Sequence, residues 1–106
     1  MANNYSVEII RYDIPENERN NFEKAYADAG KHLQESKYCL GYEVLHGDEE
    51  PNNYIVIINW TSKEDHMQGF RRSPGFMPFF NLVKSFFNYI KEMKHYELTG
   101  TQWKRE

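Results

Sequence analysis

One stretch decides the fold of this chain: residues 60–80 read WTSKEDHMQGFRRSPGFMPFF. It begins with the last residue of the most apolar strand pattern in the sequence and passes directly into a helix start. It then enters a segment that is unusually rich in phenylalanine. The predicted fold and the predicted function both depend on how these three parts lie together.

The helix start in this stretch is marked by two overlapping capping boxes, Thr61-x-x-Glu64 and Ser62-x-x-Asp65. Each box satisfies two backbone N–H groups that a helix N-terminus otherwise leaves without a partner. The pattern predicts a helix that runs to about Arg72. His66 and Phe70, four residues apart, then lie on one side of it.

A second helix is predicted after the break at residues 73–75, Ser-Pro-Gly. Serine is a good N-cap and proline a good first helical residue. Pro78 removes a backbone donor one turn later, which places the start of the regular helix nearer Met77. Seven apolar residues then fall within an arc of about 120° at 3.6 residues per turn: Phe76, Phe79, Phe80, Val83, Phe86, Phe87 and Ile90. We expect this helix to end near Met93, with a short strand at residues 94–99.

Upstream, residues 53–60 are apolar on both faces of a predicted strand. Tyr54, Val56, Ile58 and Trp60 share one face, and Ile55 and Ile57 the other. A small antiparallel sheet with one wet face alternates apolar and polar residues, so both faces of this strand should be covered. Helices cover one face, and a second copy of the sheet is the economical cover for the other. The pattern therefore predicts a homodimer.

The remaining segments complete the order. Residues 6–14 read as a strand that Pro15 ends, residues 17–36 as an amphipathic helix, and residues 38–46 as a strand with a possible bulge at Gly41. A polar turn at residues 47–53 leads into the next strand. The order βαββ(αα)β predicts a ferredoxin-like α+β fold with a four-stranded antiparallel sheet and a split second helix. We expect one domain over residues 1–106, with a core at about 5–98 and a polar tail at 99–106.

Charge and composition exclude several classes of function. The net charge is −3 and no basic stripe occurs, which argues against nucleic-acid binding. The longest apolar run, residues 54–58, is far too short to span a membrane. The N-terminal residues carry no leader pattern, and the single Cys39 fits a reducing compartment. We therefore expect a cytoplasmic protein.

The residues of the deciding stretch resemble the antibiotic biosynthesis monooxygenase (ABM) family, in the branch with an H-x-x-G-F-R-x-S segment. The matching positions are Trp60, Ser62, Glu64, His66, Gly69, Phe70, Arg71, Ser73 and Phe76, followed by His95-Tyr96. The resemblance covers about residues 5–98. It implies a dimeric α/β barrel with a pocket between sheet and helices in each subunit. Relatives include cofactor-independent oxygenases that turn polycyclic phenols into quinones, quinol oxidases and haem-degrading monooxygenases.

Two departures from the family pattern narrow the chemistry that the resemblance implies. Phe80 stands where haem-degrading members carry their iron-ligating histidine, and Ile10 or Arg11 stands in place of their strand asparagine. Haem degradation is therefore disfavoured. Phenol-oxidising members pair a tryptophan with an asparagine four residues earlier. Here Trp60 is retained, but the earlier position is Val56.

Trp60 and His66 are the candidate catalytic residues. His66 is the candidate base because an imidazole titrates near neutral pH; its alternative role is packing beside Phe70. Trp60 is a candidate for stacking on a planar substrate, or else a core aromatic residue. Arg71 either binds a ligand oxygen or forms a salt bridge.

The other candidate substrate contacts are His95, Phe70, Phe80 and Val56. Hydroxyls of Tyr12, Tyr26 and Tyr42 either enter the pocket or serve the core. Two histidines with Glu64 raise the question of a metal, but no H-x-H, H-E-x-x-H or Cys/His spacing is present, so we expect none.

These observations lead to one functional hypothesis and two alternatives. The first is a cofactor-independent monooxygenase, without metal or flavin, that acts on an aromatic or quinol-type small molecule. One alternative is a non-catalytic dimer that binds a small apolar molecule with the same fold. The other, which the Phe80 position disfavours, is a haem-binding monooxygenase.

Overall fold

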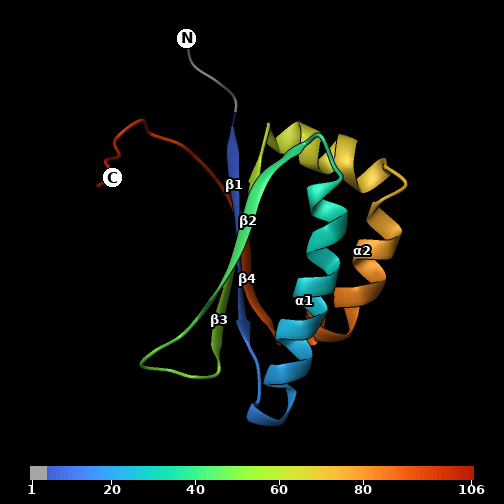
Figure 1. Ribbon diagram of the computed structural model, residues 1–106, viewed down its shortest axis with the longest axis vertical. Helices are drawn as coiled ribbons and strands as arrows, with labels where there is room; N and C mark the ends of the chain where they lie inside the picture. The colour runs from blue at the N-terminus through green and yellow to red at the C-terminus, as the bar shows by residue number, and fades with distance from the viewer. Residues whose placement is uncertain (1–4) are drawn as a thin grey trace.

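A four-stranded antiparallel sheet forms one layer of the protein (Figure 1). The computed structural model describes residues 5–106; residues 1–4, part of the N-terminal stretch used in the localisation argument, lie outside the described range. The strand order is β2-β3-β1-β4, as in a ferredoxin-like fold. The strands are β1 (Ser6–Asp13), β2 (Cys39–His46), β3 (Asn53–Trp60) and β4 (Ile90–Glu97).

Helices form the second layer, all on one face of the sheet (Figure 1). The two α-helices pack against each other: α1 (Arg19–Gln34) and α2 (Phe76–Val83). Four short helical segments complete the layer: η1 (Glu16–Glu18), η2 (Asp65–Gly69), η3 (Phe70–Arg72) and η4 (Lys84–Tyr89). The predicted α+β fold with a split second helix is confirmed.

The core lies between the sheet and α1. Alternate residues of β3 and β1 point toward the helices and are buried, as the period of two in a strand requires. The face of α1 that meets them carries Phe22, Tyr26, Ala29 and Leu33, all at most 1% exposed. Burying each large side chain contributes roughly 1.5–3 kcal/mol. These aromatic and aliphatic contacts hold the sheet and helix layers together.

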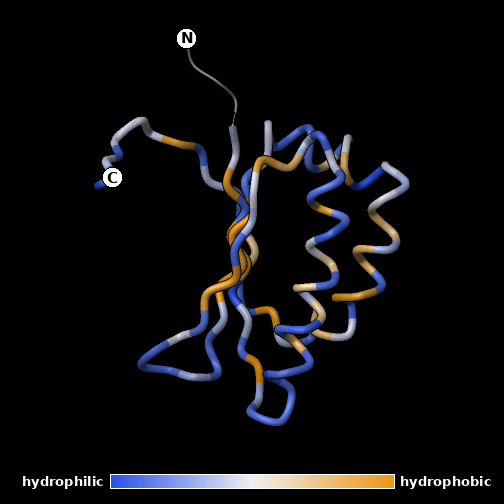
Figure 2. Tube along the Cα trace, viewed as in Figure 1, coloured by the Kyte–Doolittle hydropathy of each residue, from blue (hydrophilic) through white to orange (hydrophobic). Residues whose placement is uncertain are grey.

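The other face of the sheet carries no helix (Figure 1). Ile55 and Ile57 lie on it half-buried, and the neighbouring Leu45 of β2 is 45% exposed. The colouring in Figure 2 shows hydrophobic residues concentrated along the strands of this thin sheet. A single chain therefore leaves the second apolar face of β3 uncovered.

The Ser62 cap is confirmed, but the helix that follows is not a regular α-helix. The backbone N–H of Asp65 donates to Ser62 Oγ at 2.9 Å. The chain then forms a π-helical turn, η2, and a 3₁₀ turn, η3. A π turn holds one more residue than an α turn and rotates the side chains that follow it. His66 and Phe70 are both buried as a result.

For the phenylalanine-rich helix, the Ser73 cap and the predicted end were wrong, whereas the regular start predicted near Met77 is close to the observed one. Ser73 does not cap it, because its Oγ donates to the Phe70 carbonyl oxygen at 2.7 Å and closes the preceding turn. The helix α2 begins at Phe76. At the far end, β4 begins at Ile90, which pairs with Tyr12 of β1, instead of near residue 94. Ladder hydrogen bonds to β1 outweigh the helical pattern there.

The bulge predicted at Gly41 is confirmed, since the β2–β3 register shifts between Cys39 and Gly41. Among residues 5–106, no helix is both long enough and apolar enough to cross a membrane.

Candidate active site

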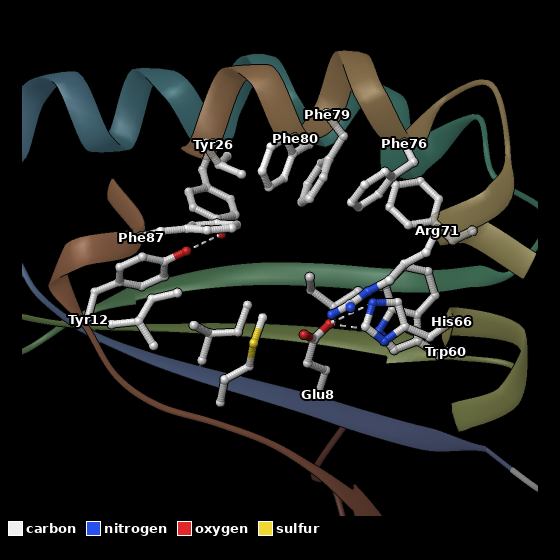
Figure 3. Close-up of a pocket in the computed structure, with 16 residues that line it drawn as sticks. Glu8, Tyr12, Tyr26, Trp60, His66, Arg71, Phe76, Phe79, Phe80 and Phe87 are labelled. Carbon is white, nitrogen blue, oxygen red and sulfur yellow. Dashed lines mark hydrogen bonds and ion pairs between the residues drawn. The ribbon is translucent and has the colours of Figure 1, made fainter. Parts of the chain in front are cut away.

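A cavity of about 190 Å³ lies between the sheet and the helices. Figure 3 shows the phenyl rings of Phe76, Phe79 and Phe80 pointing from α2 toward the sheet. Ile10 and Ile58 line it from the sheet side. The cavity is therefore an aromatic cage with an aliphatic floor, and its polar groups gather at two places.

Glu8 is the central polar residue of the cavity. It lies on the helix-facing side of β1 and is only 2% exposed. Because Glu8 pairs with Ile58 in the sheet, Trp60 is its diagonal neighbour on the same face. The indole Nε1–H of Trp60 donates to Glu8 Oε1 at 3.0 Å. Position 8 lies on the buried face of β1, where an apolar residue is usual, but here it holds a hydrogen-bonded carboxyl group.

His66 joins this carboxyl group from the helical layer. Its Nε2 lies 3.6 Å from Glu8 Oε1, and its side chain is 5% exposed. The imidazole stacks on the indole of Trp60, with ring centroids 4.2 Å apart and planes 10° from parallel. The Ser62 cap and the π turn η2 set this position, because they fix where residue 66 enters the cavity wall.

His95 lies next to Glu8 on the sheet and also contacts His66. It is the cross-strand partner of Glu8 in the β1–β4 register, so it shares the helix-facing side of the sheet. A hydrogen bond of 2.8 Å joins His66 Nδ1 and His95 Nε2. His95 is half-buried on β4, an edge strand.

Arg71 brings a positive charge to the same place. It belongs to η3, is exposed as a residue, and lines the cavity with its side chain. Figure 3 shows the side chain extending from the helical layer toward Glu8. The Arg71 charge lowers the pKa of Glu8 and of both histidines.

The surroundings shift the pKa values of Glu8, His66 and His95 so that each favours its neutral form. Burial raises the pKa of Glu8 above its ordinary 4.5, and the Trp60 hydrogen bond and Arg71 counter this only in part. Burial, followed by the charges of Arg71 and His95, lowers the pKa of His66 from 6.5 to about 3. Burial, Lys63 and Arg71 lower the pKa of His95. At neutral pH both imidazoles are neutral, so Glu8 and His66 touch without forming an ion pair.

A second polar place in the cavity is the pair Tyr12 and Tyr26. Their hydroxyl oxygens lie 2.7 Å apart, and both residues are at most 1% exposed. Burial raises the pKa of Tyr12 to about 12 and that of Tyr26 well above 10. Both hydroxyls stay protonated in the physiological range and offer neutral hydrogen-bonding groups.

The structure brings most of the sequence-predicted site residues together. Trp60, His66, Phe70, Arg71 and Phe80 all line the cavity. Two predicted contacts do not. Val56 is fully buried in the core and does not line the cavity, and His95 reaches it only through His66.

Of the three tyrosines predicted as possible pocket residues, two line the cavity and one does not. Tyr12 and Tyr26 line the cavity, whereas Tyr42 packs against Gly30 of α1 and accepts a hydrogen bond from Gln34.

The sequence analysis missed Glu8. The available signal was a lone acidic residue two positions before Ile10 and four before Tyr12 on one strand face. A charge in such a face is buried only when it is paired. Its partners, Trp60 and His66, are more than fifty positions away, so only the strand register reveals the pair.

Glu8, His66 and His95 also form a candidate metal-ligand set, with one ligand atom from each lying within 4.8 Å of the others. This set replaces the one considered from sequence, because the exposed Glu64 is not part of it. However, His66 turns Nε2 to Glu8 and Nδ1 to His95, at opposite edges of one ring. A single metal ion binds only one of these nitrogens, so the arrangement fits a cluster of mutually contacting side chains better than a chelate.

With this geometry described, comparison with known proteins places the chain. A family model described as antibiotic biosynthesis monooxygenase matches residues 6–81. The chain belongs to this family. The match includes Glu8, Trp60, His66 and Arg71, whereas His95 lies beyond it.

One curated protein resembles this ABM-family chain in sequence, and two solved structures resemble it in fold. The uncharacterized protein YczJ of Bacillus subtilis is 25% identical over 84 residues, which cover 79% of this chain and 88% of that protein. A family structure from Bordetella bronchiseptica has a TM-score of 0.75 at 22% identity and covers 91% of this chain and 98% of its own. SnoaB from Streptomyces nogalater, described as a cofactor-independent oxygenase, has a TM-score of 0.71 at 19% identity, covering 99% and 100%.

Proposed function

We propose that this protein is a cofactor-independent monooxygenase that oxidises a small hydroxylated aromatic or quinol-type molecule in the cavity beneath α2. One observation carries the proposal. A buried carboxyl group with a raised pKa lies beside a neutral imidazole at one side of a cavity walled by phenyl rings. Membership of a monooxygenase family and the fold shared with SnoaB support it.

The cavity walls favour a planar aromatic ligand. Phenyl rings bind such a molecule by offset or edge-to-face contacts, each worth about 0.5–1.5 kcal/mol beyond area burial. The cavity volume of about 190 Å³ lies below the roughly 300–1,000 Å³ of sites for drug-sized ligands. A substrate of one or two rings therefore fits better than the polycyclic phenols that the family resemblance first suggested.

The proposed base is Glu8, assisted by His66. A base works best when its pKa lies near the working pH, and burial moves the pKa of Glu8 in that direction. His66, proposed as the base from sequence, has a pKa of about 3 and is a weak base alone. It stays in the proposal as the neutral partner whose Nε2 lies 3.6 Å from Glu8 Oε1. Arg71 stabilises the substrate oxyanion.

The reaction balances without a cofactor. Glu8 takes the proton of a substrate hydroxyl, and the electron-rich anion reduces O₂ by forming a carbon–oxygen bond. The resulting hydroperoxide loses water as its O–O bond breaks and the ring carbon loses its hydrogen. One phenol and one O₂ then give one quinone and one water, and all electrons come from the substrate.

A non-catalytic binding protein is the second candidate. The observation in its favour is Val56, which is buried and apolar where phenol-oxidising relatives are expected to carry an asparagine. Such a protein would bind the same aromatic molecules in the cavity and release them unchanged. Binding without oxygen consumption distinguishes it from the monooxygenase.

We also propose that the protein works as a homodimer joined through the uncovered sheet face. Ile55, Ile57 and the exposed Leu45 give that face an apolar centre in the single chain. Light scattering tests this proposal, and a stable monomer at micromolar concentration contradicts it. Replacing Ile57 by Lys places a charge in the proposed interface and should produce monomers, whereas Trp103→Ala on the exposed tail should not.

Oxygen uptake across a panel of hydroquinols and phenols with one, two and three rings tests the catalytic proposal. Each is assayed with wild type, Glu8→Gln, His66→Ala and the exposed control Glu97→Gln. We expect uptake with one- or two-ring compounds, loss in the two site variants and retention in the control. No uptake with any compound that binds, or equal uptake in all variants, rejects catalysis at this site.

A further inference from the structure

We propose that Glu8, His66 and His95 form a proton relay that connects the buried Glu8 in the cavity with water at the edge of the sheet. The relay assigns His95 a role as a proton-conducting residue, in place of the substrate contact predicted from sequence. Its use in turnover rests on the proposed function, but its existence is measurable in the protein without substrate.

Two contacts connect the three side chains in series, within a cluster whose ligand atoms all lie within 4.8 Å of one another. Glu8 Oε1 lies 3.6 Å from His66 Nε2, and His66 Nδ1 lies 2.8 Å from His95 Nε2. The imidazole of His66 thus bridges its neighbours with both ring nitrogens. A neutral imidazole carries one donor and one acceptor nitrogen, so it can accept a proton on one edge and release one from the other.

Trp60 sets the direction of the hydrogen bonds. Its indole nitrogen is a donor only, so Glu8 Oε1 accepts from it. When Glu8 is ionised, the His66 nitrogen that faces it at 3.6 Å, Nε2, is the one that carries the proton. His66 Nδ1 is then the acceptor, and His95 Nε2–H is the donor. This order leaves His95 Nδ1 as the free acceptor at the outer end.

A single proton moves through this chain with all protons balanced. One proton from water binds His95 Nδ1, the Nε2 proton of His95 passes to His66 Nδ1, and the Nε2 proton of His66 passes to Glu8. The chain ends with Glu8 protonated and both imidazoles again neutral in the other tautomer. The reverse sequence ionises Glu8 and returns one proton to water.

Burial makes such a route useful. Glu8 is 2% exposed and His66 4% exposed, whereas His95 is half-buried on the edge strand β4. A ligand in the cavity would separate Glu8 further from water. The relay lets Glu8 exchange a proton with solvent while the cavity is occupied.

Burial, and after it the nearby charges, keep both imidazoles neutral at rest. Arg71 of η3 acts on all three members, and Lys63, which precedes η2, acts on His95. Each resting imidazole therefore keeps one acceptor nitrogen. The 3.6 Å contact between Glu8 and His66 exceeds the usual hydrogen-bond length of about 2.7–3.2 Å. This distance must shorten before a proton can pass between His66 and Glu8.

Exchange of the His66 ring proton with water tests the relay in the ligand-free, full-length protein. The exchange rate of the His66 imidazole N–H is measured by ¹⁵N NMR in wild type, His95→Gln and the control His32→Gln on α1. Glutamine fills similar space and forms a hydrogen bond but does not pass protons through. We expect exchange at least about a hundredfold slower in His95→Gln, the low end for a positioned proton-transfer group.

The sign of the change separates the relay from a structural role. Loosened packing around His66 would speed exchange, whereas loss of the relay slows it. A slower exchange rate in His95→Gln supports the relay. An N–H signal of His66 that is visible only in His95→Gln supports it too, because exchange is then too fast to observe only in wild type. An unchanged rate, a faster rate, or a signal too fast to observe in both proteins overturns it.

A second variant covers the case in which His95→Gln fails to fold. In His95→Ala, added imidazole should restore exchange, and a series of methylimidazoles should do so in order of their basicity. No restoration contradicts the relay. Because neither measurement uses oxygen or substrate, loss of the relay and failure of the proposed oxygenation give different results.

Discussion

Replacing Glu8 by glutamine should stabilise the protein at neutral pH, although it removes a central residue of the site. Glutamine keeps the shape of the side chain and keeps an oxygen that accepts from Trp60 Nε1. It removes the charge, whose burial is the largest cause of the raised pKa of Glu8. Desolvation of a buried carboxylate costs several kcal/mol, and one hydrogen bond to a charged group returns about 1.5–3 kcal/mol. We expect a gain in unfolding free energy on the order of 1 kcal/mol.

The pH dependence gives this prediction its sign. An acid whose pKa is raised in the folded state contributes stability fully below its unfolded pKa, here 4.5, and loses that contribution as the pH rises through the folded value. The advantage of Glu8→Gln should therefore be near zero below pH 4.5 and should grow toward pH 8.

Urea unfolding at several pH values measures this difference. The exposed Glu97→Gln should change the unfolding free energy by less than about 0.5 kcal/mol at every pH. A Glu8→Gln variant that is less stable than wild type at pH 8, or a difference that does not vary with pH, refutes the reasoning. Either result would mean that the Glu8 carboxylate is stabilised in the folded state.

The remaining predictions concern His66, the hydrogen-bonded pair Tyr12 and Tyr26, and the glycine Gly30. The pKa of His66 is about 3 in the folded state and 6.5 in the unfolded state. His66 therefore contributes up to roughly 5 kcal/mol of unfolding free energy above pH 6.5, and this contribution is lost as the pH falls through 3. Acid unfolding of His66→Gln, followed by circular dichroism, should show a weaker loss. Tyr12→Phe and Tyr26→Phe should each cost about 1–3 kcal/mol by leaving one buried hydroxyl unpaired, and the double variant less than the sum, in a double-mutant cycle. Gly30→Ala should cost about 1–3 kcal/mol in urea unfolding, because its Cβ would lie 1.9 Å from the Tyr42 hydroxyl oxygen.

Each of these predictions has a contradicting outcome. Equal acid sensitivity of wild type and His66→Gln would show that burial does not hold His66 neutral. Additive tyrosine costs would show that the two hydroxyls do not depend on each other. Gly41→Ala is the control for Gly30→Ala, since its Cβ would meet nothing closer than 3.9 Å. Equal costs at the two glycines would contradict the packing argument.

The sequence predicted the sheet well because local patterns determine it. The β3 strand has the predicted boundaries, 53–60, since a polar turn precedes it and a capping box follows. The bulge at Gly41 and the buried stripe of α1 follow from equally local signals. The end of the last helix was wrong because the apolar spacing up to Ile90 suits a helix face. Only pairing with β1 assigns Ile90 to a strand.

The sequence predicted only part of the site. The contacts that it did not predict join residues that are far apart in the chain. Trp60 and His66 lie close in sequence and carry a recognisable pattern, so their proximity was foreseeable. Glu8 joins them only through the β1–β3 register, and His95 meets His66 only because β4 pairs with β1. The π turn that turns His66 toward Glu8 has no sequence signal that we recognise.

Oxygen consumption with a two-ring hydroxylated aromatic, in the presence of a metal chelator, tests the central claim most directly. We predict that wild type consumes one O₂ for each quinone formed. We also predict that Glu8→Gln, folded and able to bind the compound, is slower by at least about a hundredfold, the low end for loss of a general base. A Glu8→Gln protein as fast as wild type would contradict the assignment of Glu8 as the base. Binding without any oxygen consumption would contradict the proposed activity.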